Sequence, residues 1–421
     1  MTKYQNRTLE KSLNDAIGNW PVIMITGPRQ VGKTTLLNHF VETSNIKINY
    51  ISLDNILIRT QAREDPELFL RTYEAPLIID EFQYAPELLS YIKIKVDEAR
   101  KKEMFEEGKE VGTLYYLTGS QVFQTMKNVS ESLAGRIRIF DLYGFSEREC
   151  EQIEEPIFLP DINKLKEKKK ISNKSTKEIF QKILDGSYPL VRNNNGKNRE
   201  QFYETYIRTY IERDVRQIIN IKDETKFIKF ISSIAARTAQ EYNAFDIATD
   251  IGVDAKTVEE WTSILKNTNL IYMLNAYSNN NIKKAIKRPK IYFMDTGLAC
   301  YLTGYLSSET LEKSAYNGAI FETYIVSEIV KSYTNNGKDP RTRLYYYRDK
   351  NQKEIDLLIF HDNTVYPVEI KKSANPEKMA IKNFDVIKNI EAVSGNGIVL
   401  CMMENIMSID ENNYYVPIEY V

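Results

Sequence analysis

The segment GPRQVGKTT has the residue types and the spacing that bind the phosphates of a nucleotide. It satisfies the pattern G-x-x-x-x-G-K-[ST] and consists of Gly27, Pro28, Arg29, Gln30, Val31, Gly32, Lys33, Thr34 and Thr35. Glycines let the backbone curl so that successive N–H groups face phosphate oxygens at the start of a helix. Lys33 would neutralise the β and γ phosphates, and the Thr34 hydroxyl would be a ligand of Mg2+. The segment therefore predicts a site for ATP and Mg2+, with a chance glycine turn as the alternative.

The residues around this segment predict the elements that such a site needs. An apolar run over residues 22–25 predicts a buried strand, and TTLLNHFVET predicts the helix that follows the glycines. A second apolar run ends in Asp80 and Glu81. Asp80 would hold Mg2+ through water, and Glu81 would polarise the attacking water. Two acids that only cap a helix are the alternative.

A third apolar run, in TLYYLTGSQVF, ends in Thr118, Ser120 and Gln121. If this strand lies beside the second one, one of these side chains would sense the γ phosphate, and we assign Ser120 to the nucleotide site. A polar strand-to-helix turn is the alternative. Arg136 follows a glycine and is our candidate for an arginine that stabilises transition-state charge, from the same chain or from a neighbouring subunit. Otherwise it is an ordinary surface residue.

Two segments near the carboxyl end, EIDLLIF and TVYPVEIKK, predict adjacent strands joined by HDN. Because strand side chains alternate, Glu354 and Asp356 share one face, and so do Glu369 and Lys371. The opposite faces would be apolar and buried, through Ile355, Leu357, Ile359, Val368 and Ile370. An acid followed by acid-x-lysine matches the PD-(D/E)xK nuclease pattern. In it, Asp356 and Glu369 would hold Mg2+ against the scissile phosphate, and Lys371 would activate water.

A carboxylate on a helix would complete that site. NGAIFETYIVSEIV predicts a helix in which Thr323, Ser327 and Lys331 mark the solvent stripe, while Glu322 lies on the other side among apolar residues. A carboxylate there costs free energy unless a metal or Lys371 compensates. One alternative is a charged edge hairpin with a glutamate that reaches the solvent. Another is a nuclease-like fold that binds without cutting.

The middle of the chain predicts helices and a hairpin. The lysine-rich stretch DINKLKEKKKISNKSTKE favours a solvated linker or an exposed helix. Residues 225–305 have the order of helices, turn and hairpin that is typical of a winged helix. Gly252 would allow a tight turn, and Asp254 would cap the next helix. The hairpin tip would be basic, with Lys283, Lys284, Lys287, Arg288 and Lys290. Such a tip could bind DNA phosphates without sequence preference. The alternative is that this module binds a protein partner.

The composition is that of a soluble globular protein with several domains. The chain has 421 residues, 42% apolar, and a formal net charge of -1, so no overall basic field favours nucleic acid. The three cysteines and two histidines are scattered, which argues against a disulfide framework or a zinc site and favours magnesium on oxygen ligands. Neither a signal peptide nor a run of about 18 apolar residues is evident, which predicts a cytoplasmic protein without membrane contact.

The segments GPRQVGKTTLL, EDPELFL, LIIDEFQYAPELL, YYLTGSQ, SLAGR and FSERE together resemble the AAA-type ATP-binding proteins of bacteria and archaea whose C-terminal half is a domain of unknown function. GSYPLV, YIERDV and YFMDTGLACYL resemble the second half of that family. The resemblance implies an α/β fold, with an AAA-like parallel sheet of the P-loop NTPase class, then a winged-helix segment. A C-terminal α/β domain similar to restriction endonucleases would follow.

We therefore expect a P-loop ATPase domain over residues 1–150, a helical linker over 151–224, a winged-helix-like domain over 225–305 and a nuclease-like domain over 306–421. The leading hypothesis is that ATP turnover controls binding or cleavage of nucleic acid by the last domain. The alternative is an ATP-driven switch that docks protein partners and carries an inert nuclease-like domain. Association into a homo-oligomer is a further expectation.

Overall fold

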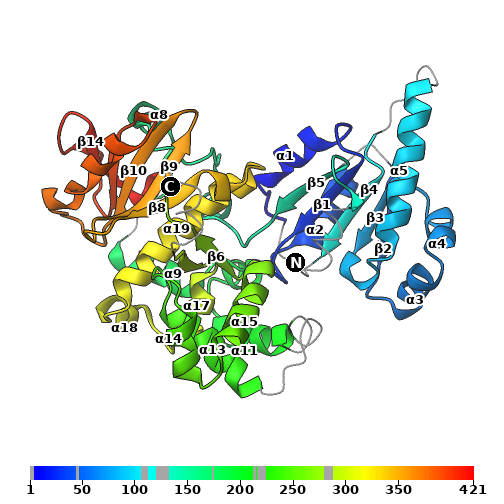
Figure 1. The fold of residues 1–421 in the computed structure, drawn as a ribbon, viewed down its shortest axis with the longest axis horizontal. Helices are drawn as coiled ribbons and strands as arrows, with labels where there is room; N and C mark the ends of the chain where they lie inside the picture. Colours follow the sequence, from blue (N-terminus) through cyan, green and yellow to red (C-terminus); the bar gives the residue numbers. More distant parts are fainter. Residues whose placement is uncertain are drawn as a thin grey trace.

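The computed structural model describes residues 4–43, 47–105, 112–119, 132–172, 175–211, 215, 224–278 and 288–421, and these form three parts (Figure 1). The amino-terminal part is a parallel sheet with helices, the middle part is helical, and the carboxyl-terminal part is built on a mixed sheet. One hydrophobic core extends from Leu9 through the middle helices to Val421. The parts are therefore joined by buried apolar contacts.

Five described strands form the amino-terminal sheet, in the order β2-β3-β4-β1-β5, and every neighbouring pair is parallel. Their bounds are β1 (Val22–Thr26), β2 (Asn49–Ser52), β3 (Leu77–Asp80), β4 (Tyr115–Gly119) and β5 (Ile137–Asp141). The helices of this part are α1 (Leu9–Ala16), α2 (Lys33–Thr43), α3 (Ile56–Glu64), α4 (Pro66–Thr72), η1 (Phe82–Tyr84), α5 (Leu88–Phe105) and α7 (Glu147–Cys150). Strands β1, β3 and β4 are buried along their whole length because both faces of the sheet are covered, which explains their continuous apolar runs. The predicted parallel α/β sheet is confirmed.

The middle part consists of helices followed by a two-stranded antiparallel sheet. Its elements are α8 (Ile162–Glu167), α9 (Thr176–Asp185), α10 (Pro189–Asn193), α11 (Arg199–Tyr210), α13 (Glu224–Ala236), α14 (Ala244–Ile251), α15 (Ala255–Asn267), β6 (Ile271–Leu274), β7 (Lys290–Phe293), α17 (Thr296–Leu302) and α18 (Ser308–Lys313). Gly252 ends α14 in the left-handed conformation, and the Asp254 carboxylate caps α15 by accepting from the Thr257 N–H, as expected. The order of three helices and a hairpin follows the predicted one.

The lysine-rich stretch after the first sheet forms the expected exposed helix in part, since Asn163, Lys164, Lys166 and Glu167 of α8 are exposed, but its apolar residues are anchored. Phe158, Ile162 and Leu165 are buried, and the Ile171 N–H donates to the backbone carbonyl of Glu419, 3.0 Å away. The segment therefore packs along the carboxyl-terminal part. The apolar residues of this segment lie between the lysines and before them. Their burial determines where the segment packs, because the free energy gained outweighs the cost of holding the lysine stems at the surface.

Seven described strands form the carboxyl-terminal sheet, in the order β13-β14-β12-β10-β9-β8 with β11 beside β10. Their bounds are β8 (Leu344–Arg348), β9 (Glu354–His361), β10 (Thr364–Ile370), β11 (Val393–Ser394), β12 (Gly397–Cys401), β13 (Met407–Ser408) and β14 (Asn413–Pro417). Short 3-10 helices lie around it: η3 (Pro340–Thr342), η4 (Lys378–Ile381), η5 (Phe384–Asn389) and η6 (Ile418–Tyr420). The predicted hairpin exists, since β9 and β10 pair antiparallel through the turn at Asp362 and Asn363.

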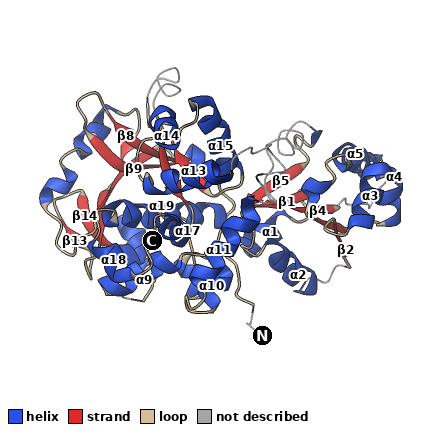
Figure 2. Cartoon of the chain, turned by 90° about the horizontal axis from the view of Figure 1, so that it is seen from below, coloured by secondary structure: helices blue, strands red, loops and turns tan. Residues whose placement is uncertain are grey.

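Helix α19 (Asn317–Asn335) runs through the centre of the molecule and contacts α1, α9, α17, α18, β5 and β7 (Figure 1, Figure 2). Thr323, Ser327 and Lys331 are 0%, 2% and 2% exposed, so the predicted solvent stripe is wrong. Their polar groups are satisfied inside the protein, and the Lys331 ammonium donates to the Phe145 carbonyl, 3.1 Å away. A helical wheel cannot distinguish polar residues that face water from polar residues that bond to another part of the chain. Among the described helices, this one included, none is long and apolar enough to cross a membrane.

Candidate functional site

The glycine-rich segment forms a loop between β1 and the start of α2. Gly27, Gln30 and Gly32 have positive φ angles of 146°, 61° and 95°. A Cβ atom on Gly27 would lie 2.0 Å from the carbonyl oxygen of Leu142, so both conformation and space require glycine there. Nothing lies within 4 Å of the corresponding position on Gly32, which leaves open space at the start of α2. A helix N-terminus that faces open space favours an anion.

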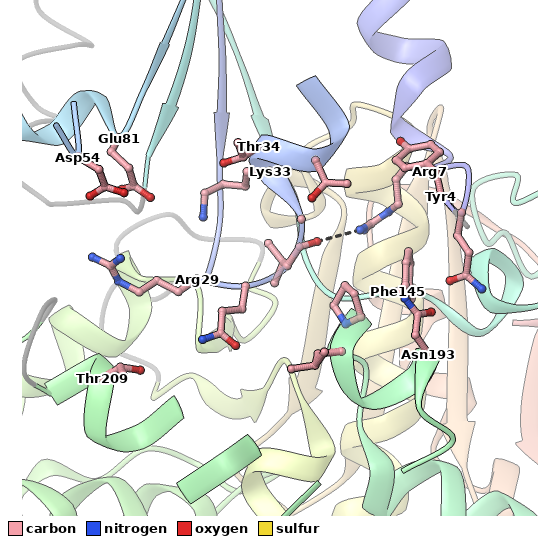
Figure 3. Close-up of a pocket in the computed structure, with 17 residues that line it drawn as sticks. Tyr4, Arg7, Arg29, Lys33, Thr34, Asp54, Glu81, Phe145, Asn193 and Thr209 are labelled. Carbon is pink, nitrogen blue, oxygen red and sulfur yellow. Dashed lines mark hydrogen bonds between the residues drawn. The ribbon is translucent and has the colours of Figure 1, made fainter. Parts of the chain in front are cut away.

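The loop is held from inside and from the amino-terminal segment. The Lys33 ammonium donates to the carbonyls of Gly27 and Pro28, at 2.9 and 2.8 Å. The Arg7 guanidinium donates to the carbonyl of Val31, 3.1 Å away, and this contact is the dashed line in Figure 3. Lys33 is only 8% exposed, so its charge already lies at the centre of the loop. The loop is therefore preorganised around the cation that would meet phosphate.

Thr34 and Asp80, the two residues predicted to hold Mg2+, are in direct contact. The Thr34 hydroxyl donates to the two carboxylate oxygens of Asp80, at 3.1 and 3.2 Å. The hydroxyl of Tyr50 donates to the same carboxylate at 2.8 Å, and the Thr118 hydroxyl donates to it as well. A hydroxyl beside a carboxylate is an oxygen donor set that fits Mg2+. This contact exists because β3 and β1 are parallel strands that end at the same edge of the sheet.

Glu81, the predicted water-activating residue, follows β3 in a strained backbone conformation. Its φ and ψ angles are 55° and 43°, in the left-handed region. Its N–H donates to the Thr118 hydroxyl at 3.3 Å, and the Gln83 side-chain amide donates to its carboxylate. Such conformations persist where the surrounding structure holds them and are frequent at functional sites. The carboxylate of Glu81 lies in the pocket beside Lys33 (Figure 3).

A pocket of about 760 Å³ lies over the loop and has walls from two parts of the molecule. The loop, Asp54 and Glu81 form the side that belongs to the parallel sheet. The amino-terminal segment adds Tyr4 and Arg7. Helices α10 and α11 add Pro189, Leu190, Asn193 and Thr209. Sequence reasoning missed this second wall, because nothing in the local pattern of α10 or α11 indicates what they face.

Of two other predicted residues, one lies outside the described chain and the other does not reach this pocket. Ser120 lies outside the described residues. Arg136 precedes β5, at the opposite end of the sheet from the loop, because β1 and β5 are parallel. A five-residue strand spans about 17 Å, so Arg136 does not reach the pocket of its own chain. Its guanidinium instead pairs with Asp97 of α5, at 2.6 Å between Nε and Oδ1. The contact with a neighbouring subunit stays a prediction.

The predicted carboxyl-terminal residues do come together. The Lys371 ammonium lies 2.6 Å from Glu369 and 4.0 Å from Asp356. The Asp356 carboxylate also accepts from the Ile370 N–H at 2.9 Å, which ties β9 to β10. Glu322 of α19 joins the group through a further cation, which the sequence analysis placed at the tip of the hairpin. The nuclease-like pattern is therefore a cluster in space, with four acids in all when Glu354 is included.

The further cation is Lys290, and its position corrects the predicted basic hairpin tip. Its ammonium lies 2.6 Å from Glu354, 3.2 Å from Glu322 and 3.9 Å from Asp356. The residue is 4% exposed, and the neighbouring Tyr292 hydroxyl donates to Glu322 at 2.7 Å. Lys290 and Tyr292 are two residues apart on β7 and therefore share a face. This local pattern does not show that the face meets Glu322 of α19. Of the other tip residues, Arg288 is exposed, and Lys283, Lys284 and Lys287 lie outside the described residues.

The crowded acids have raised pKa values. Burial and the nearby Asp356 charge raise the pKa of Glu322 to about 7, against the opposing effects of Lys290 and Tyr292. Burial and the same aspartate raise the pKa of Glu369 to about 8, against Lys371. Within the described residues, no group of three or more His, Cys, Asp or Glu side chains is arranged to hold a metal ion. The predicted metal ligands Asp356 and Glu369 bond instead to the backbone and to lysine.

The predicted apolar residues Ile355, Leu357 and Ile359 of β9 are all buried, but a β-bulge divides them between two hydrophobic clusters. Tyr345 faces Leu358 and Tyr347 faces Ile355, so β9 has one residue more than β8 over this stretch. Ile355 consequently packs with Leu358 in a separate hydrophobic cluster. Leu357 packs in the large core that extends from Leu9 to Val421. A bulge turns the neighbouring side chains relative to a regular strand. The bulge includes Asp356, which is one of the acids of the cluster.

The fold and the loop define a P-loop nucleotide-binding protein. Residues 19–151 match the model of an AAA domain, so the amino-terminal part is an AAA-type ATPase domain. Residues 176–309 match a domain of unknown function (DUF8612), and residues 317–421 match another (DUF4143).

Similar proteins add little about activity. The chain is 25% identical over 373 residues to an uncharacterized protein of Mycobacterium bovis and to one of Mycobacterium tuberculosis, with 88% of this chain and 75% of each relative covered. The Holliday junction branch migration motor RuvB of Thermotoga maritima is 18% identical, with a TM-score of 0.31 and 63% of this chain and 88% of that one covered. The ORC2 protein of Aeropyrum pernix is 13% identical, with a TM-score of 0.33 and coverage of 73% and 92%.

Proposed function

We propose that this protein is a Mg2+-dependent ATPase that acts as a nucleotide-driven switch. The observation that supports it is the two-walled pocket, in which Leu190 and Asn193 of α10 and Thr209 of α11 face the P-loop. A nucleotide bound there would contact both walls, so ATP and ADP would favour different positions of the middle helices. A ligand shifts such an equilibrium by its difference in affinity for the two arrangements.

The residues of the loop would carry out hydrolysis as follows. Thr34 and Asp80 would hold Mg2+, which when bound neutralises phosphate charge. Lys33 would exchange its bonds to the loop carbonyls for bonds to the phosphate oxygens, because its ammonium lies within the loop that would receive the phosphates. Glu81 would orient the attacking water and accept its proton. The charge that develops on the phosphate would be met by Lys33 and the N-terminus of α2.

A chain of contacts leads from the pocket to the carboxyl-terminal part. Arg192 of α10 pairs with Glu147 at 2.8 Å, and the Glu147 N–H donates to Glu328 of α19 at 2.8 Å. The same helix carries Glu322 into the acidic cluster. A shift of α10 would therefore act on α19, and this rigid helix would change the surface that the carboxyl-terminal part offers to a protein partner.

Hydrogen exchange of the full chain tests the switch. With a non-hydrolysable ATP analogue and Mg2+, we expect slower exchange of the backbone amides over residues 186–193 as well as over the P-loop, because the nucleotide would order both walls. Amides of α14, which does not line the pocket, serve as the internal control. Protection confined to the P-loop and to residues 80–81 would contradict the proposal.

Magnesium-dependent binding or cleavage of nucleic acid is the second candidate function. It is favoured by the convergence of Glu322, Asp356, Glu369 and Lys371, the residue set expected for a PD-(D/E)xK site. Hydrolysis of a phosphodiester there would need a metal on the carboxylates and a water near Lys371.

A nuclease assay tests this second function directly. Single-stranded DNA, duplex DNA and RNA would be incubated with Mg2+ or Mn2+, with and without ATP. If the site cuts, Asp356→Asn should lower cleavage at least about 100-fold, since it removes a group that acts on the reacting phosphate. Asp385→Asn, an exposed carboxylate of the same part, is the matched control. Substrates that stay intact under all conditions exclude cleavage.

A further inference from the structure

The acidic cluster has a lysine where its carboxylates converge. Glu322 comes from α19, and Glu354 and Asp356 come from β9, yet all three point at the Lys290 ammonium, with distances of 3.2, 2.6 and 3.9 Å. Burial by itself would lower the pKa of Lys290, but Tyr292 and the surrounding carboxylates raise it well above its usual value. The ammonium therefore stays charged at the centre of the cluster.

Lys290 is held in place along its whole length. It is the first residue of β7, where it pairs with Leu274 of β6 on one side and bridges to Glu241 on the other. Its ammonium also lies 5.7 Å from the ring centre of Tyr346. The backbone pairings fix the Cα of Lys290. A change of rotamer that took the ammonium away would leave three buried or half-buried carboxylates without the cation that they share, which opposes it.

A divalent cation and this ammonium exclude each other. Mg2+ needs oxygen ligands at about 2.1 Å and Ca2+ at about 2.4 Å, and both need the carboxylate oxygens that Lys290 engages. A metal among these oxygens would also lie close enough to the ammonium for strong repulsion between like charges. The cluster can therefore be neutralised by Lys290 or by a metal, and not by both at once.

We propose that Lys290 is the resident cation of the acidic cluster, so that the carboxyl-terminal part binds no divalent metal at Glu322, Glu354 and Asp356. The chain itself thus supplies the positive charge that a metal supplies in a metal-dependent nuclease. This inference goes beyond the proposed switch function, and it removes Glu322 and Asp356 from the metal ligands that the second candidate function would need. It does not depend on ATP hydrolysis, so it can fail while the switch stands.

Binding of Mn2+ to the nucleotide-free full chain tests the proposal, with free Mn2+ followed by electron paramagnetic resonance. Asp80→Asn serves as the background, because it removes the carboxylate at the end of β3 that contacts Thr34 of the P-loop. We expect this background protein to bind no Mn2+ with a Kd below about 1 mM. Lys290→Met should create a Mn2+ site at least about tenfold tighter, because the three carboxylates that now surround the ammonium could move together around a metal once the ammonium is gone. Adding Glu354→Gln should remove that site again.

Two controls keep the result decisive. Lys371→Met removes the neighbouring lysine, which is 42% exposed at its side chain, and should create no comparable site. Lys290→Arg keeps the charge and should behave as the background does. If Lys290→Met does not fold, Mn2+ binding by the Asp80→Asn protein alone tests the proposal. Mn2+ binding or a Mn2+-induced rise in Tm that is lost on Asp356→Asn would overturn the proposal, as would a folded Lys290→Met that gains no Mn2+.

Discussion

Replacing Glu81 with glutamine should leave ATP bound and slow its hydrolysis by about 10²–10⁴-fold, because the amide cannot accept the proton of the attacking water. The substitution keeps the shape of the side chain and its contact with Gln83. Binding would be measured by calorimetry with ATP and Mg2+, and hydrolysis by phosphate release. Hydrolysis at the wild-type rate would show that another group activates the water.

Two variants sharpen this result. Lys33→Met should lose ATP binding itself, since it removes the charge that the loop carbonyls hold in position. Glu87→Gln changes an exposed glutamate shortly after β3 and should alter neither binding nor hydrolysis. If Lys33→Met binds ATP as the wild type does, the P-loop is not the nucleotide site, and the assignments of Thr34, Asp80 and Glu81 fail with it.

Replacing Arg192 with methionine should lower the free energy of unfolding by about 3 kcal/mol, because it leaves the Glu147 carboxylate buried with one partner fewer. Glu147 is 5% exposed, and its cations are Arg192, at 2.8 Å, and Lys182. Burial alone would raise the pKa of Glu147, yet these two cations lower it, so the carboxylate is ionised and needs them. Urea titration followed by fluorescence would measure the loss.

A compensated variant and a surface pair test the cause. Arg192→Met together with Glu147→Gln should recover most of the lost stability, because it removes the unpaired charge. Arg237→Met breaks a pair with Asp250 whose side chains are 28% and 50% exposed, and should cost less than about 1 kcal/mol. A loss as large for Arg237→Met as for Arg192→Met would mean that burial of the charge is not the cause.

The conformation of the P-loop could be predicted because its residues are close in the sequence and its geometry is local. Gly27, Gly32, Lys33 and Thr34 lie on one short turn, whose conformation follows from the glycines. The pairing of Thr34 with Asp80 needed one further step, that two apolar runs are parallel strands ending at the same edge. In buried parallel sheets the strands are apolar runs, and their carboxyl ends lie at the same edge of the sheet.

The carboxyl-terminal cluster could be predicted only in part. Asp356, Glu369 and Lys371 lie on one hairpin, and strand alternation brings them together. The bulge at Asp356 and the approach of Lys290 could not be predicted, because neither follows from any periodicity of the chain. The failed helical wheel of α19 has the same origin, since its polar residues bond to other parts of the chain.

The sequence by itself determined the nucleotide loop, the acids that follow β3, the parallel sheet and the acidic hairpin, because each depends on contacts within one element or between adjacent ones. Only the tertiary structure decided that α10 and α11 close the nucleotide pocket, that Arg136 faces away from it, and that Lys290 neutralises the acidic cluster. These features depend on how distant elements pack against α19. The free energy of that packing is spread over many buried contacts between the three parts, and no single stretch of sequence contains it.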